Sequence, residues 1–150
     1  MRQLRLFVAG VAGVLIASGC QCGDSLSQLP MPAAVLVHDG DETPPADHLV
    51  VDIGVIEIDT RVETVFTLRN DGTRDLEIRG MQFNSDPLLC PTASGAFQLE
   101  PLTGVVAAGS GRNFLVAYTP STGDTGCTVL EVATDDRSHP WLRAVLSGRG

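Results

Sequence analysis

TRVETVFTLRNDG, residues 60–72, is the stretch of sequence that decides the fold. Val62, Phe66 and Leu68 share one face of an extended chain, and charged or polar residues occupy most of the other. This period-two alternation predicts a β-strand that covers a hydrophobic core on one side only. The strand runs into Asn-Asp-Gly, a typical turn sequence, and the segments that follow repeat the same design.

Seven short β-rich runs separated by turn residues extend from Leu49 toward the end of the chain. They are residues 49–58, 61–70, 74–83, 96–102, 113–120, 127–134 and 141–148. No run has helical periodicity over a sufficient length. The pattern predicts an all-β fold, an antiparallel β-sandwich of about seven strands.

Two of these runs carry finer predictions. In residues 74–83 the apolar positions change phase across Gly80, which predicts a β-bulge there that keeps both sets of apolar side chains on the core side. Residues 113–120 are apolar on both faces, which is typical of a strand inside a sheet.

Length and charge limit the number of domains and the kinds of partner that the protein can have. The chain has 150 residues, enough for one domain, which we place at residues 48–150. Its 18 acidic residues outnumber its 10 basic ones, and the net charge is −8. A surface of this sign disfavours nucleic-acid phosphates, so no nucleic-acid partner is expected.

In residues 1–19, charged, apolar and small residues follow one another in the order that is typical of a secretory signal peptide. Arg2 and Arg5 precede the apolar run LFVAGVAGVLI, residues 6–16, and small residues follow it. The apolar run is about half as long as the roughly 20 residues that span a bilayer. A permanent transmembrane helix is therefore not expected from it.

ASGC, residues 17–20, resembles a bacterial lipobox, in which the cysteine is diacylated and becomes the new amino terminus. Ala17 stands where that family usually has Leu. The resemblance implies a lipid anchor on Cys20, which would hold the protein at the bacterial cell envelope. Gln21, in place of Asp, favours the outer membrane. The alternative is a plain signal peptide followed by a disulfide-forming cysteine.

Residues 20–47 are rich in proline and acidic side chains, which predicts a flexible tether. One exception is AAVLVH, residues 33–38, which has the composition of an additional edge strand. The acidic cluster DGDE, residues 39–42, lacks the ligand spacing of a calcium loop, so we expect no metal there.

The region from Leu49 to Gly150 resembles the ASH-type (abnormal spindle and Hydin) immunoglobulin-like domain, often found in bacteria as the "choice-of-anchor D" repeat. The matching positions are Gly54, Asn70, Gly72, Thr119, Pro120, Leu146, Ser147, Gly148 and Gly150. The departures from the family pattern are Ile53 and Tyr118 for Phe, Ala108 for Pro, and Asp59 for Gly. The resemblance implies an immunoglobulin-like sandwich used for binding or scaffolding, and it brings no catalytic residues.

If Cys20 is acylated, three cysteines remain. Because an exported protein meets an oxidising compartment, we expect a disulfide between Cys90 and Cys127. Cys22 would then stay free near the membrane or pair between molecules. A zinc site is the alternative, but Cys90 and Cys127 lack the usual Cys-x-x-Cys spacing.

No catalytic motif is present, and no enzyme activity or cofactor is expected. His38, His48 and His139 are scattered over polar segments, where solvated surface is expected. Asp135 and Asp136 are expected to cap a turn. Trp141 is expected to cover the core or a sheet, and a platform for a glycan is the alternative.

These features together predict a non-enzymatic, membrane-anchored lipoprotein that binds a protein partner or acts as a scaffold at the cell envelope. The first strand of the domain, residues 49–58, has few charges to protect its edge. It would either be paired by residues 33–38 or be open to strand addition by a partner. An accessory glycan- or ligand-binding module is the alternative function.

Overall fold

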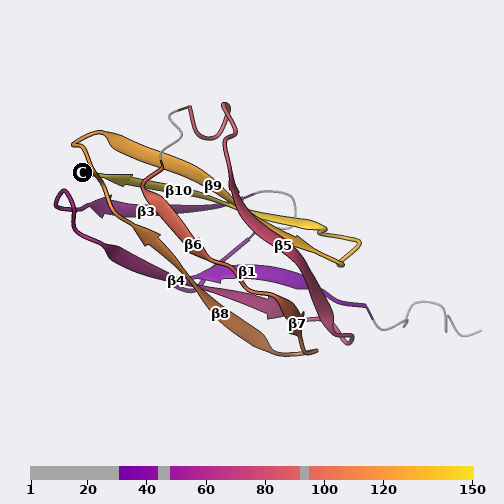
Figure 1. Ribbon diagram of the computed structural model, residues 1–150. Helices are drawn as coiled ribbons and strands as arrows, with labels where there is room; N and C mark the ends of the chain where they lie inside the picture. Colours follow the sequence, from indigo (N-terminus) through magenta and orange to yellow (C-terminus); the bar gives the residue numbers. More distant parts are fainter. Residues whose placement is uncertain (1–30, 44–47, 92–94) are drawn as a thin grey trace, which may run out of the picture.

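The computed structural model describes residues 31–43, 48–91 and 95–150, and no helix occurs among them. Figure 1 shows two β-sheets that pack face to face. The strands are β1 (Ala34–His38), β2 (Asp41–Glu42), β3 (Leu49–Val55), β4 (Val62–Asn70), β5 (Leu76–Asn84), β6 (Phe97–Glu100), β7 (Gly104–Val106), β8 (Gly111–Tyr118), β9 (Thr125–Thr134) and β10 (Trp141–Arg149).

One sheet has the strand order β2-β1-β4-β8-β6, and the other has the order β3-β10-β9-β5-β7. The predicted sandwich and all seven predicted strands are confirmed. The pairing differs from the prediction in one place, because β3 and β10 run parallel while the other neighbours are antiparallel. The chain crosses from β2 in one sheet to β3 in the other before it enters β4.

β4 covers the core on one face, as its alternation predicts. Phe66 and Leu68 are fully buried, and the ring of Phe66 stacks on that of Phe114 in β8 with centroids 5.5 Å apart. β8 has a neighbour on each side and carries three consecutive buried residues, so its predicted position inside a sheet is confirmed. Stacked aromatic pairs of this kind add to the free energy gained from burial alone.

The predicted bulge at Gly80 is present. The register between β5 and β9 shifts between Ile78 and Gly80. Leu76 and Ile78 before the bulge are buried, and Met81 and Phe83 after it pack against the same core. The extra residue is Arg79, which is exposed.

A disulfide joins Cys90 to Cys127, as predicted, with the two Cα atoms 5.6 Å apart. It fixes the loop after β5 to the outer face of the second sheet, where Val129 and Val145 pack against the two cysteines. Cys20, Cys22 and the predicted signal peptide lie outside the described residues.

The sandwich also includes strands that precede residue 48. Residues 34–42, assigned above to the tether, form the β1–β2 hairpin, and β1 pairs with β4 along its length. Ala34 and Leu36 are buried in the core. The additional edge strand expected at residues 33–38 is thus present as β1. β7 was missed, because three residues are too few for alternation to show.

Candidate functional site

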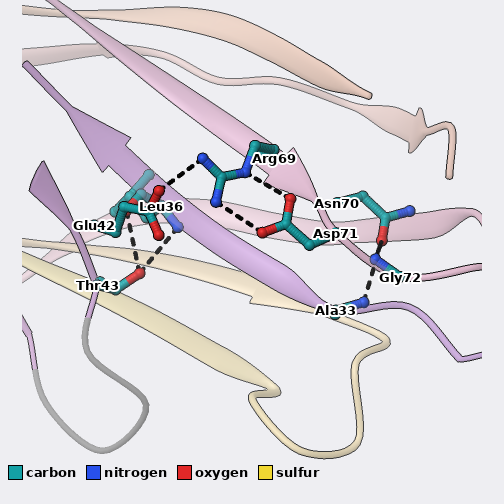
Figure 2. Close-up of polar contacts among 8 residues, drawn as sticks. All are labelled: Ala33, Leu36, Glu42, Thr43, Arg69, Asn70, Asp71 and Gly72. Carbon is teal, nitrogen blue, oxygen red and sulfur yellow. Dashed lines mark hydrogen bonds and ion pairs between the residues drawn. The ribbon is translucent and has the colours of Figure 1, made fainter. Parts of the chain in front are cut away.

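Asn70, at the end of β4, is the hydrogen-bonding centre of the region where the N-terminal hairpin joins the sandwich (Figure 2). Its side chain is fully buried. Oδ1 accepts hydrogen bonds from the backbone N–H groups of Ala33 at 3.1 Å and Gly72 at 3.0 Å. Nδ2 donates to the carbonyl oxygens of Arg74 at 2.8 Å and Val106 at 3.1 Å. One amide therefore fixes the N-terminal strand, the β4–β5 turn and β7.

Gly72 allows the N-terminal segment to lie directly on the β4–β5 turn. A Cβ atom at this position would collide with backbone atoms of Met31, Pro32 and Ala33. Two backbone hydrogen bonds join the same segments, from the N–H of Asp71 to the Ala33 carbonyl at 2.8 Å and from Thr73 to Met31 at 3.0 Å. The Asn-Asp-Gly sequence, predicted only as a turn, thus also binds the start of β1.

Asp136 fixes β1 from the opposite sheet. This carboxylate is 1% exposed, and its oxygens accept hydrogen bonds from the N–H groups of Ala34 at 3.0 Å and Ser138 at 2.8 Å. Burial raises the pKa of Asp136, but hydrogen bonds from the backbone of Ala34, Ser138 and His139 outweigh it and lower the pKa below its ordinary value. The predicted capping of the turn is confirmed, and the contact with β1 was not predicted.

Arg69 closes the hairpin on its outer side (Figure 2). Its guanidinium contacts Glu42 at 2.8 Å and forms a two-pronged pair with Asp71 through Nε and Nη2 at 2.6 and 2.7 Å. The hydrogen bond from Arg69 lowers the pKa of the Asp71 carboxyl. Because these groups are solvent-accessible, each pair contributes at most about 1 kcal/mol. The hairpin is held mainly by Asn70, Asp136 and the ladder to β4.

β3 is the longest open edge of the sandwich. The four edge strands are β2, β3, β6 and β7, and β3 has seven residues against two to four for the others. It pairs with β10 on one side, and no strand among the described residues pairs with its other side. Val50 is 66% exposed and Val55 is 78% exposed. A long edge with apolar side chains is unusual, because such strands invite pairing with another chain.

The prediction that residues 33–38 pair with this first strand is wrong, since β1 pairs with β4 in the other sheet. The alternative prediction, that the edge of this strand is open to a partner, agrees with the strand order. Asp52 is the one charged residue within β3, and its Oδ1 accepts a hydrogen bond from the N–H of Gly54 at 2.9 Å. Gly54 has a φ of +86°, which bends the strand near its end.

Trp141 was expected to cover the core or a sheet, and it does not lie in the core. It begins β10 on the outer face of its sheet, where its side chain is 53% exposed. The residue opposite it in β9 is Ala133, and the next one across, in β5, is Gly80. Alternation along β10 places the apolar residues Leu142 and Ala144 in the core, so Trp141 has the opposite phase.

Chemistry-bearing side chains do not converge. Among the described residues, no three His, Cys, Asp or Glu side chains are grouped as metal ligands. His38, expected on solvated surface, instead stacks on Phe66 with ring centroids 4.8 Å apart, and its Nδ1 lies 3.1 Å from the Val65 carbonyl oxygen. His139 lies 3.6 Å from Asp136. In the described part of the chain, no helix is long and apolar enough to cross a membrane.

Several solved structures share the fold of this chain at low identity. A protein of unknown function from Porphyromonas gingivalis aligns with a TM-score of 0.61 and 12% identity over 81% of this chain, which spans about half of that protein (48%). The ASH/PapD-like domain 7 of human CEP192 aligns with a TM-score of 0.56 and 14% identity over 98% of this chain and 97% of that one. The sequence suggested a likeness to ASH domains, and this alignment confirms that the chain has the same fold.

A third similar structure is the VesB protease of Vibrio cholerae, with a TM-score of 0.50 and 15% identity over 69% of this chain and 31% of that one. No curated protein matches the sequence. The family model described as "HYDIN/CFA65/VesB-like, Ig-like domain" matches residues 46–144, about two-thirds of the chain. The chain therefore belongs to the HYDIN/CFA65/VesB-like family of immunoglobulin-like domains.

Proposed function

We propose that this protein is a lipid-anchored, non-enzymatic module of the choice-of-anchor D type that binds a protein partner at the bacterial cell envelope. The observation that carries the proposal is the open edge of β3, with its exposed Val50 and Val55. A partner strand that pairs there gains main-chain hydrogen bonds, and the valines add apolar contacts.

The attachment of the N-terminal hairpin defines where the predicted tether would join the domain. Asn70 and Asp136 hold residues 33 and 34 from the two sheets, so the chain that leads back to Cys20 departs from a rigid point. An acyl group on Cys20 would therefore retain the domain at the membrane through the predicted tether. Two or more acyl chains are needed for durable anchoring.

We expect the mature protein to begin at acylated Cys20. Intact mass spectrometry of the membrane-extracted protein should show the mass of residues 20–150 plus the acyl groups, and Cys20→Ser should release the protein from the membrane fraction. Cys22→Ser is the matched control and should stay in the membrane fraction. A mature protein that is cleaved elsewhere, or a Cys20→Ser variant that remains membrane-bound, contradicts the anchor.

Proline at neighbouring positions of β3 tests strand addition. Successive N–H groups of a strand point to opposite edges, so Val50→Pro and Val51→Pro remove donors from different edges, and proline is tolerated only where the donor is unpaired. We expect the variant that has lost a β10 hydrogen bond to be destabilised, because proline removes a donor from the ladder. The other should keep its thermal unfolding temperature within a few degrees but lose co-purification of its partner from solubilised membranes. If that folded variant retains the partner, the partner does not bind by strand addition.

A second candidate function, glycan binding, is favoured by one observation. Trp141 is exposed on the outer face of a sheet, where the apolar face of its indole is available to a sugar ring.

A further inference from the structure

A hollow of about 450 Å³ lies at the end of the second sheet where β9 turns into β10. Three arginines line it: Arg74 precedes β5, Arg79 is the extra residue of the β5 bulge, and Arg137 lies in the β9–β10 turn. Pro140, which immediately precedes Trp141, forms part of the wall. Separate features of the fold therefore bring three positive charges to one hollow.

The carboxylates beside this hollow are already engaged. Asp135 pairs with Arg74 at 2.7 Å and also accepts a hydrogen bond from the N–H of Glu77 at 2.8 Å. Asp136 is buried and bonded to backbone N–H groups, as described above. Arg79 and Arg137 form no ion pair with any described residue. In a protein with a net charge of −8, two exposed guanidinium groups without carboxylate partners mark a local site for an anion.

Trp141 directly follows Pro140, which lines the hollow, and begins β10 on the outer face of the sheet. The residues across the sheet from it are Ala133 and then Gly80, and directly opposed side chains on one face of a sheet lie about 5 Å apart. A Cβ atom added to Gly80 would meet nothing within 4 Å. The residues across the sheet from Trp141, Ala133 and Gly80, are therefore small and do not fill the surface between β10 and Arg79 of the β5 bulge.

This combination distinguishes between classes of ligand. An apolar peptide side chain requires an enclosed apolar pocket, whereas this hollow is lined by charged and polar groups. A sugar ring has an apolar face that packs on an aromatic ring, and polar edges that suit an open surface. Guanidinium groups bind carboxylates with paired hydrogen bonds. An exposed indole next to free arginines thus fits a sugar that bears a carboxylate.

We infer that the hollow and Trp141 form a binding site for an acidic saccharide, with the sugar ring on the indole and the carboxylate on Arg79 and Arg137. The inference rests on the second candidate function, glycan binding, and is independent of strand addition at β3. That edge lies two strands away from β9, on the far side of β10.

Trp141 is the only tryptophan in the chain, so intrinsic fluorescence reports on this site alone. The full-length chain is titrated with an oligogalacturonate, with a neutral oligosaccharide of the same length, and with polyglutamate. We expect a saturable change in emission with the oligogalacturonate, weakened by salt. Arg79→Gln and Arg137→Gln should each raise its Kd about tenfold or more, the loss expected for one charge-assisted hydrogen bond. Arg61→Gln, a similarly exposed arginine paired with Glu63, is the control and should leave the Kd unchanged.

Calorimetry with Trp141→Ala completes the test, because that variant has no tryptophan fluorescence. Its Kd for the oligogalacturonate should also rise about tenfold or more. If the neutral sugar shifts the emission and the arginine variants bind it normally, glycan binding stands and the acidic specificity is wrong. If polyglutamate binds as tightly as the sugar and Trp141→Ala has no effect, the site recognises peptide carboxylates and the inference is wrong. If neither sugar binds, both the inference and the second candidate function fail.

Discussion

Asn70→Ala is expected to lower the free energy of unfolding by about 3–5 kcal/mol and the Tm by roughly 15–30 °C. The substitution removes all four hydrogen bonds of a fully buried amide. The Val106 carbonyl oxygen loses a buried partner that water cannot easily replace, and such an unpaired group is costly. The loss also releases the start of β1, so hydrogen exchange should accelerate in β1 before it does in β9.

Asn113→Ala is the matched control for this prediction. Asn113 is an exposed amide on β8 whose side chain contacts the Thr67 hydroxyl at 2.9 Å. We expect a change below about 0.5 kcal/mol, as for other surface substitutions. Equal effects of the two substitutions, measured by chemical denaturation, would refute the central role of Asn70.

Gly148→Ala is expected to lower the free energy of unfolding by about 2–3 kcal/mol, a typical cost of overpacking a core. A Cβ atom at Gly148 would lie 2.7 Å from Cε1 of Tyr118. Tyr118 is 1% exposed, and its ring packs against Phe97 with centroids 4.7 Å apart, so it has little room to move. The residue opposite Gly148 in β9 is Gly126, which shows that two glycines meet at this point of the sheet. Thermal unfolding followed by circular dichroism measures the effect.

Gly80→Ala is the control for Gly148→Ala. Gly80 also lies in a strand of the same sheet, but a Cβ atom there meets nothing within 4 Å, and its φ is not in the left-handed region. We expect no destabilisation from this change. If Gly148→Ala were as stable as Gly80→Ala, close packing of Tyr118 would not explain the closing Leu-Ser-Gly-x-Gly sequence.

The sequence predicted those parts of the fold that have a repeating pattern. Alternation over eight to ten residues revealed the long strands, a change of phase at Gly80 revealed the bulge, and an oxidising compartment led to the pairing of Cys90 with Cys127. The additional edge strand expected at residues 33–38 is present as β1, but its pairing with β4 was not predicted, because prolines and acidic residues dominate the composition around it. Short strands such as β7 have no pattern to detect.

The candidate sites depend on contacts between distant segments, and the sequence shows these poorly. Asn70 continues the inward phase of Phe66 and Leu68, so its burial was detectable, but its partners in the N-terminal segment and in β7 were not. The phase of Trp141 relative to Leu142 and Ala144 also indicated an outward side chain, and we gave more weight to the general burial of aromatic residues.

Photo-crosslinking in the native envelope tests most directly the central claim that a partner binds at the open edge of β3. A photoreactive amino acid replaces Val50 or Val55 at this edge, and replaces Val65 as the control, a 48% exposed valine on the other sheet. The account predicts the same crosslinked protein from Val50 and Val55, none from Val65, and loss of the product in the folded proline variant of β3. Crosslinking of that protein from Val65 but from neither β3 position would contradict the account.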